Sequence, residues 1–512
     1  MNQPDEPGGP TRRDVVRALA FGAGAGMLAS ASDAAPVRAD STVRWDDTAD
    51  LVIVGSGAAG ISAALEARAQ GLDVLVLERF TIPGGSSSLS GGVCYLGGGT
   101  PLQRALGFED SEEEMLKYLL AACGPRGLRD KIEVYCAGSL EHFDWLVKQG
   151  VAYAQRYSDE KELSHAAASL YYCGSERVQP YSTIARPAPR GHVPAAENQT
   201  GGRALMQTLL GAATRAGVRM RTEVVASRLV LESDGRIAGL QAQHAGKTIA
   251  LRAKRAVVLA AGGFIHNSEM LRRHAPELAV CRPRWGRAGD LGDGIRMGVA
   301  AGAATLHMQQ GFAVLPLYPP EHVLKGIVVN AHAQRFINED VYYGALGHEV
   351  VYQQGGRAYL IVDANCDYAQ PDFRLVVAAS AATVADLGRQ LGLPAAMLER
   401  SVEYYNGHAS AGLDPLFNKA AKFLAPLVQP PFKAYDLGVE EAFITVHTLG
   451  GLQTDVDGRV IDAWGQPIPG LYAAGRTTAG LPTAPYTSSG TSIGDGTFFG
   501  RRAARHAARV ST

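Results

Sequence analysis

Three glycines and one acidic residue near the start of the chain have the spacing of a dinucleotide-binding site. The segment Val52 to Gly60 is a short apolar run that breaks into Gly55-x-Gly57-x-x-Gly60. In such a turn the first glycine allows a tight bend, the second lets a pyrophosphate approach the backbone, and the third lets the next helix pack on its strand. The free N–H groups at the helix start favour an anion. The following apolar run VLVL ends in Glu78, where an acid would hold a ribose hydroxyl.

A second cluster of glycines and hydroxyls, GGSSSLSGG, follows at residues 84–92. We interpret it as a backbone surface that lies along a flat cofactor, because small side chains avoid a clash there. Two more glycine segments are AAGGF at residues 260–264 and GTSIGDG at residues 490–496. The first ends a buried strand, as expected at the carboxyl edge of a parallel sheet beside a cofactor, and the second begins a helix.

The elements that must hold these glycines alternate between strands and helices. Strands are predicted at 52–54, 74–77 and 256–264, with further alternating strands between 219 and 252, and helices at 106–148 and 201–216. Residues 157–199 are irregular and contain PAPRGH, so we predict a loop over the site. The pattern predicts an α/β, Rossmann-like domain with a parallel sheet and a β-meander.

A second, α+β domain is predicted at residues 280–433, because the pattern of the nucleotide-binding domain resumes only afterwards. Strands are expected at 323–329 and 358–362, and residues 378–405 should be mostly helical with a break at Pro394. The predicted order is therefore a signal segment at 1–39, the nucleotide-binding domain at 45–279 and 434–512, and the inserted domain between them.

Composition excludes several classes of function. The chain has 512 residues, of which 46% are hydrophobic and 19% charged, with a net charge of −1, so it has no electrostatic footprint for nucleic acid. No segment after the N-terminus approaches the roughly 18 apolar residues of a membrane span. The six cysteines form no C-x-x-C pair, which excludes covalent haem and zinc ribbons, and no metal site is predicted.

The first 39 residues resemble a twin-arginine export signal. Arg12 and Arg13 precede a short run rich in alanine and glycine, and small residues offer cleavage sites at 29–31 and 37–39. Export to the periplasm is therefore expected. The alternative is an inert basic tail on a cytoplasmic protein.

Taken in order, the glycine segments, Glu78, HTLGG at 447–451 and GLYAAGR at 470–476 give the chain a family resemblance. Over residues 48–508 it resembles the flavoproteins that include fumarate reductase and the 3-ketosteroid dehydrogenases. The resemblance implies FAD with its pyrophosphate near Gly55, its ribose near Glu78, and its isoalloxazine ring near residues 86–92 and Gly490. It implies that these residues bind FAD: Gly55, Gly57, Ala58, Ala59, Gly60, Glu78, Arg79, Gly85, Ser86, Ser87, Ser90, Gly91, Gly92, Val225, Ala261, Gly262, Asp293, Gly475, Gly490, Thr491, Ser492 and Ile493.

The residues expected near the flavin argue against a dicarboxylate substrate. The family's fumarate reductases carry one arginine shortly after an R-F-x-N-E segment and another in the last glycine motif. Here the first segment reads RFINEDVYY at 335–343 and the second PYTSSG at 485–490, so both arginines are missing. His447 matches a histidine that those reductases use on a carboxylate, but it cannot replace two fixed cations.

Hydroxyl groups stand where the arginines would be. The resemblance to the ketosteroid dehydrogenases implies that the Tyr486 hydroxyl and the Gly490 N–H polarise a 3-keto oxygen. Ser488 resembles the serine of the Δ4-(5α) enzymes, which handles the proton together with a tyrosine of the R-F-x-N-E segment. Tyr342 and Tyr343 both qualify by position, and Tyr342 is favoured because N-E-D-x-Y-x-G resembles the Δ4 type. Neutral hydroxyls are poor bases, so a proton relay outward is required.

The resemblance implies an FAD-dependent dehydrogenase acting on CH–CH groups of a 3-ketosteroid, with the Δ4 bond of a 5α-steroid favoured, and a separate electron acceptor that the sequence does not identify. Alternatives are a Δ1-dehydrogenase, an ene-reductase on another unsaturated acid or ketone, and an electron-carrier subunit without chemistry of its own.

Overall fold

The computed structural model describes residues 35–38, 43–160, 168–196, 200–317, 321–367 and 375–510. Apart from residues 35–38, the expected export signal lies outside the described residues. No helix in the described part of the chain combines the length and the apolar character that a membrane crossing requires.

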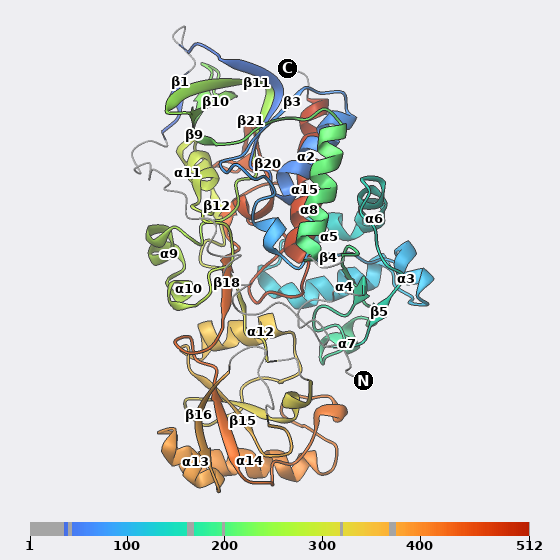
Figure 1. Ribbon diagram of the computed structural model, residues 1–512, viewed down its shortest axis with the longest axis vertical. Helices are drawn as coiled ribbons and strands as arrows, with labels where there is room; N and C mark the ends of the chain where they lie inside the picture. The colour runs from blue at the N-terminus through green and yellow to red at the C-terminus, as the bar shows by residue number, and fades with distance from the viewer. Residues whose placement is uncertain are drawn as a thin grey trace, which may run out of the picture.

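A nine-stranded sheet forms the upper part of the molecule (Figure 1). Its strands run in the order β1-β9-β10-β11-β2-β3-β8, and β21 also pairs with β11 and carries β20. The pairs β11–β2, β2–β3, β3–β8 and β11–β21 are parallel, whereas β9, β10 and β11 form an antiparallel meander. The predicted parallel sheet with a β-meander is confirmed. The strands are β1 (Val37–Arg38), β2 (Asp47–Val54), β3 (Val74–Leu77), β8 (Arg219–Arg221), β9 (Val224–Leu231), β10 (Ile237–His244), β11 (Lys247–Leu259), β20 (Arg459–Ile461) and β21 (Pro467–Ala473).

The prediction that the last of the alternating strands before residue 252 is separate from the strand at 256–264 is wrong, because β11 is one strand of 13 residues. Its first half pairs with β10, and its second half lies between β2 and β21. The register against β2 shifts between Ala253 and Ala256, and such a bulge bends a strand from one set of neighbours to another. The strand ends at Leu259, so residues 260–264 lie beyond the sheet edge.

Three helices cover one region of this sheet, namely α2 (Ala58–Ala69), α8 (Gly201–Arg215) and α15 (Thr491–Arg509). Figure 1 shows α2 and α15, which lie far apart in sequence, in contact along their length. The approach is close because Gly500 has no side chain, and a Cβ there would lie 2.3 Å from the Ala59 carbonyl oxygen. This packing places the N-termini of both helices near the carboxyl edge of the sheet.

A helical lobe with a small sheet lies beside α8 and α15 (Figure 1). The predicted loop at 157–199 is not wholly irregular, because short strands within it pair with β4 in the order β4-β7-β6-β5. The lobe contains α3 (Pro101–Ala105), α4 (Glu112–Cys123), α5 (Arg129–Ala137), α6 (Ser139–Lys148), α7 (Tyr181–Ile184), β4 (Cys94–Tyr95), β5 (Tyr157–Ser158), β6 (Leu170–Tyr171) and β7 (Gly191–His192).

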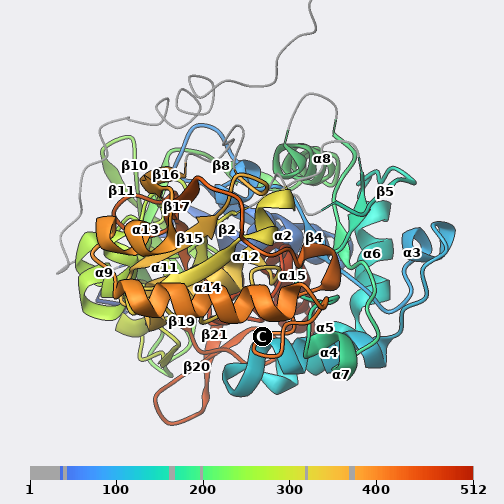
Figure 2. The same ribbon diagram turned by 90° about the horizontal axis from the view of Figure 1, so that it is seen from below.

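A four-stranded antiparallel sheet, which we call the cap sheet, forms the lower part of the molecule. Its order is β14 (Ile327–Asn330), β15 (Ala358–Val362), β17 (Phe432–Asp436) and β16 (Val376–Ala381). Helices α13 (Val384–Gln390) and α14 (Ala395–Ala409) cover its side that faces away from the nine-stranded sheet (Figures 1 and 2).

Two predictions in the cap sheet need correction. Residues 376–381 form a strand and not the start of a helix, because they pair with β17 along its whole length. The strand expected at 323–329 begins only at Ile327, after a short 3-10 turn at Glu321–Lys325. The predicted break at Pro394 is confirmed, since α13 and α14 end and begin on either side of it.

The remaining elements connect the two sheets. Strands β13 and β18 pair with each other, and α12 packs against β13 between the cap sheet and the large sheet (Figure 1). These elements are α9 (Ser268–His274), α10 (Pro276–Val280), α11 (Asp293–Ala300), β12 (Thr305–Leu306), β13 (Gly311–Val314), α12 (Tyr343–His348), β18 (Thr445–Thr448) and β19 (Gly451–Leu452).

Candidate active site

The Gly55 turn has the shape that a phosphate-binding loop needs. Gly55 has φ +104°, and a Cβ there would lie 2.3 Å from the Ala260 oxygen. A Cβ on Gly60 would lie 2.0 Å from the Gly55 oxygen, so only glycine allows helix α2 to pack this closely. At Gly57 a Cβ would meet only Ser87 Oγ, at 3.5 Å. The first and third glycines therefore serve packing, and the second leaves space over the backbone for a ligand.

The start of α2 and the acid that follows β3 lie beside this space. Helix α2 begins at Ala58 after Gly57, which offers no side-chain cap, and the Ala58 N–H donates to Ser87 Oγ at 3.1 Å. Glu78 is buried and accepts from the N–H groups of Ser56 at 3.3 Å and Phe80 at 2.9 Å. A carboxylate held in this way is suited to accept hydrogen bonds from ribose hydroxyls.

The other residues predicted to bind the cofactor come from several elements but meet along one edge. Arg79 forms an ion pair of 2.6 Å with Asp293, and Ser86 Oγ donates to Asp290 at 2.8 Å. The Ser90 hydroxyl donates to the Ser87 carbonyl. This bond stabilises the turn that begins after Gly85 and precedes Gly91 and Gly92. Partly exposed predicted residues on this edge are Ala261, Gly262, Ser492 and Ile493, and Val225 is partly exposed on β9.

Gly475 and the N-terminus of α15 complete the edge. A Cβ on Gly475 would lie 2.9 Å from Ala59 Cβ, so the two predicted segments are in contact. Gly490 has φ +93° and precedes Thr491, the first residue of α15. Two helix N-termini, the open backbone over Gly57 and a buried carboxylate fit the pyrophosphate, the flavin and the ribose of a dinucleotide.

Tyr342 and Tyr343 share one hydrogen-bond partner, which the sequence interpretation missed. Ser489 Oγ lies 2.9 Å from Tyr342 Oη and 2.8 Å from Tyr343 Oη. The two rings are 4.2 Å apart, and both belong to the turn that opens α12. The Tyr342 N–H donates to Ser175 Oγ at 3.0 Å, which ties this turn to the helical lobe. Both tyrosines therefore meet the geometric requirement for a proton-transfer role with Ser489.

The resemblance implies that Ser488 handles the proton together with one of these tyrosines, but in the structure its hydroxyl contacts a different phenol. Its side chain is fully buried, and its Oγ lies 3.0 Å from Tyr118 Oη on α4. Ser489, in contrast, is partly exposed. Neighbouring side chains in an extended segment point in opposite directions, and residue 488 pairs with Gly174 as in a strand. Tyr118 was missed because it lies within the periodic pattern of a predicted helix, and Ser489 because the family spacing pointed to its neighbour.

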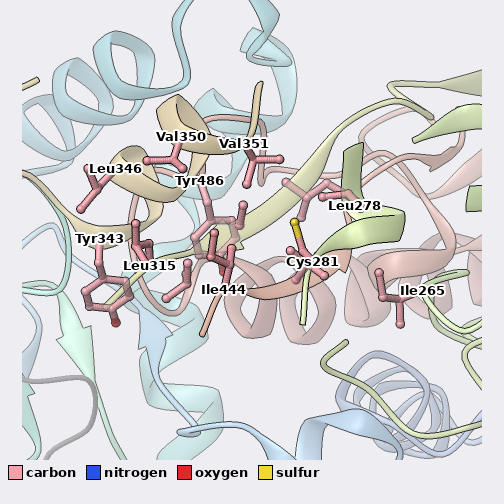
Figure 3. Close-up of a cluster of buried hydrophobic side chains, with 14 of the residues drawn as sticks. Ile265, Leu278, Cys281, Leu315, Tyr343, Leu346, Val350, Val351, Ile444 and Tyr486 are labelled. Atoms are coloured by element: carbon pink, nitrogen blue, oxygen red, sulfur yellow. The ribbon is translucent and has the colours of Figure 1, made fainter. Parts of the chain in front are cut away.

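Tyr486 lies at the N-terminus of α15, together with Gly490. Its hydroxyl accepts from the Ser492 N–H at 3.0 Å and donates to Ser492 Oγ at 2.9 Å. A phenol that accepts an N–H bond becomes a better donor, because successive hydrogen bonds polarise each other. The Tyr486 ring packs edge-on against Phe312. Figure 3 shows Tyr486 and Tyr343 in one buried cluster with Leu315, Leu346 and Val350.

The phenols and the imidazole of this cluster carry no charge at neutral pH. Burial raises the pKa of Tyr343 to about 12 and that of Tyr342 well above its ordinary value, so both phenols stay protonated at neutral pH. His447 stacks on Phe312 with ring centres 4.3 Å apart. Burial, and then the charge of Arg476, lower the pKa of His447 to about 3. The histidine is therefore uncharged and cannot clamp a carboxylate.

Comparisons with known proteins agree with this geometry. The sequence model of the FAD binding domain family matches residues 50–493. The chain is 32% identical to a 3-oxo-5-alpha-steroid 4-dehydrogenase of Comamonas testosteroni, over 85% of this chain and 93% of that protein. It is 30% identical to a urocanate reductase of Eggerthella lenta, over 90% of this chain and 75% of that protein.

A solved structure extends the comparison to three dimensions. The crystal structure of 3-ketosteroid-delta4-(5alpha)-dehydrogenase from Rhodococcus jostii RHA1, in complex with 4-androstene-3,17-dione, is 41% identical with a TM-score of 0.88. The structural match covers 93% of this chain and 100% of the Rhodococcus chain. The chain therefore belongs to the FAD-binding flavoprotein family of the fumarate reductases and 3-ketosteroid dehydrogenases, and it is an FAD-dependent oxidoreductase.

Proposed function

We propose that the chain dehydrogenates a 3-ketosteroid and introduces a double bond conjugated to the keto group, with the Δ4 bond of a 5α-steroid favoured. The observation that carries this proposal is that the phenols of Tyr342, Tyr343 and Tyr486 lie in one region with Ser489 and the uncharged His447. Neutral donors suit an uncharged ketone, whereas a dicarboxylate requires fixed positive charge. The names of the Comamonas and Rhodococcus relatives support the same substrate class.

The first chemical task is to polarise the ketone. We assign it to the Gly490 N–H and to the Tyr486 hydroxyl, whose proton turns from Ser492 Oγ to the keto oxygen; both groups lie at the positive end of helix α15. Donors fixed in this way contribute on the order of 3 kcal/mol each to stabilising the developing oxyanion. Polarisation of the keto oxygen makes the proton on the adjacent carbon acidic.

The second task is to accept that proton, and we assign it to the serine pair with the tyrosines. Ser488 fits the family spacing from Tyr486, and Ser489 faces both Tyr342 and Tyr343. Ser488 contacts the phenol of Tyr118, and Ser489 contacts that of Tyr342. Each serine hydroxyl can therefore release its own proton to a phenol as it accepts one from the substrate. Bound FAD supplies the acceptor for the hydride that leaves the neighbouring carbon.

The predicted domain division and the export signal remain part of this proposal. We propose that residues 280–433 cover the site, because α12 carries Tyr343 and leads into the cap sheet. We also propose export through the twin-arginine signal of residues 1–39.

The experiment that tests the function is anaerobic reduction of the bound flavin by a panel of 5α-3-ketosteroids and Δ4-3-ketosteroids. A 5α-3-ketosteroid should bleach the oxidised flavin, and the product should carry the Δ4 bond. Bleaching by a Δ4-3-ketosteroid with formation of a Δ1 bond would indicate a Δ1-dehydrogenase instead. Absence of bleaching by every steroid would overturn the proposal.

A second candidate is reduction of an unsaturated acid, because the urocanate reductase is 30% identical over most of this chain. In that case the chemically reduced enzyme should be reoxidised by urocanate or fumarate and not by a Δ4-3-ketosteroid. The neutral His447 argues against this outcome.

A further inference from the structure

A buried carboxylate that the chemistry above does not use lies behind the two serines. Glu176 is 1% exposed, and one of its oxygens, Oε2, accepts from the Gly174 N–H at 2.9 Å. Its other oxygen, Oε1, is buried and has no hydrogen-bond partner in the part of the chain that the structure describes. A buried, half-satisfied carboxylate is costly and calls for an explanation.

The segment that carries Glu176 is joined directly to the serines. Gly174 pairs with Ser488, and the Ser489 N–H donates to the Cys173 carbonyl at 2.8 Å. The Ser175 N–H donates to Tyr118 Oη at 2.9 Å, and the same phenol contacts Ser488 Oγ at 3.0 Å. Ser175 therefore binds the Tyr118 hydroxyl that contacts Ser488, and the next residue along the chain is Glu176.

The charges around Glu176 leave it able to bind a proton. Arg190 is fully buried and already forms a bidentate pair with Asp110, at 2.7 and 3.0 Å, which leaves its Nη1 without a partner among the described residues. In the described part of the chain, the carboxyl groups of Asp110 and Glu176 therefore have only this one guanidinium between them. Burial raises the pKa of Glu176 above its ordinary value, against the opposing charge of Arg190. The other titratable groups that face this cluster are Tyr95, Tyr118, Tyr171, Tyr172 and Cys173.

We propose that Glu176 is the group that receives the substrate proton from the serine and tyrosine hydroxyls. The C–H bond next to the ketone breaks, each hydroxyl accepts one proton and releases its own, and the last proton forms an O–H bond on the Glu176 carboxylate. The electron pair of that C–H bond remains with the substrate and forms the new double bond as hydride leaves the next carbon for FAD. One ordered water between Tyr118 and Glu176 Oε1 completes the last step, and such waters are typical where buried polar atoms lack partners.

This inference rests on the proposed function and solves a problem within it. A serine, or a phenol with a raised pKa, already carries its proton at neutral pH and cannot keep a second one, so another base must accept the substrate proton. Glu176 does not touch the substrate in this account, so it is a positioning and proton-storing residue and not a catalytic one.

The test is Glu176→Gln, which keeps the shape of the side chain and removes its basicity. In the holoenzyme, the rate of flavin reduction by a 5α-3-ketosteroid should fall about 100-fold, the typical value of a general base, with steroid affinity unchanged. The parent rate should fall as the pH drops through the raised pKa of Glu176, and this acid limb should be absent from the variant. Infrared spectra should show a protonated buried carboxyl group in the parent protein at low pH that the variant lacks.

Glu114→Gln is the matched control, because Glu114 also accepts a backbone N–H, from Arg186, but lies near the surface on α4. It should keep the parent rate and pH profile. Glu176→Asp retains a carboxylate and should retain the acid limb at a lower rate, which provides a test if the glutamine variant fails to fold. A glutamine variant with the parent rate and the parent acid limb would overturn the inference.

If no ketosteroid reduces the parent flavin, the proposed function has failed and not this inference. The same variants are then compared with the substrate that the parent accepts. If the parent and Glu176→Gln then have equal pH profiles with that substrate, the role of Glu176 is overturned for that reaction as well.

Discussion

At the scale of single residues, Ser489 determines how the hydroxyl groups of the pocket are connected. It contacts the hydroxyls of both Tyr342 and Tyr343, whereas Ser488 contacts Tyr118 behind it. The two serines are neighbours in sequence but face different phenols. Their roles can therefore be separated by single substitutions.

We expect Ser489→Ala to lower the rate of flavin reduction by a 5α-3-ketosteroid about 100-fold, the scale of a lost acid–base group. The reason is that two phenols lose their shared partner at once. Stopped-flow absorbance of the flavin measures this rate, and Ser488→Ala is the matched comparison. Full loss of activity in Ser488→Ala with a normal rate in Ser489→Ala would show that the proton follows the family spacing and not these contacts.

At the scale of elements, the turn that carries Tyr342 and Tyr343 is held by a buried network of charges. Arg335 pairs with Glu339 at 2.8 Å and with Asp414 at 3.0 Å, and Lys419 contacts Glu339 at 3.2 Å. All four side chains are almost fully buried. Two cations and two anions balance one another, so removal of one partner leaves a buried charge unpaired.

Asp414→Asn should therefore lower the free energy of unfolding by about 3 kcal/mol, as is typical when one partner of a buried ion pair is removed. Urea denaturation of the holoenzyme measures the change. Asp386→Asn is the control, because Asp386 forms an exposed pair with Arg389 and should leave stability unchanged. An Asp414 variant as stable as the parent would contradict this reading of the network.

Glycine motifs and buried strands could be predicted from the sequence because both are local signals. The Gly55 turn, the two parallel strands and the N-terminus of α15 all lie where they were expected. Strand β16 could not be predicted, since its pairing with β17 joins residues more than fifty positions apart. Likewise, only tertiary contacts distinguish Ser489 from Ser488 and bring Tyr118 and Glu176 to the same site.

At the scale of the whole molecule, buried neutral histidines link stability to pH. His192 is fully buried, with its ring nitrogens 2.9 Å from Thr100 Oγ1 and 3.1 Å from the Arg190 carbonyl oxygen. Burial lowers its pKa to about 4, whereas the unfolded chain takes up the proton near 6.5. Because the unfolded state binds more protons between these values, stability is lost as the pH falls through this window.

We expect His192 to contribute a slope of about 1.4 kcal/mol per pH unit between about pH 6.5 and 4. His192→Gln should reduce the pH dependence of the free energy of unfolding by that amount, as measured by denaturation at several pH values. The exposed His332 provides the control, since His332→Gln should keep the parent slope. An unchanged slope in the His192 variant would show that its protonation is not linked to folding.

The central claim is that neutral hydroxyls activate an uncharged ketone beside the flavin. It is tested most directly by anaerobic stopped-flow reduction of the flavin with a 5α-3-ketosteroid in the parent protein and in Tyr486→Phe. We predict rapid bleaching in the parent and a rate about 100- to 1,000-fold lower in the variant, the scale of one lost oxyanion donor. Equal rates in the two proteins, or reduction only by a dicarboxylate substrate, would contradict the claim.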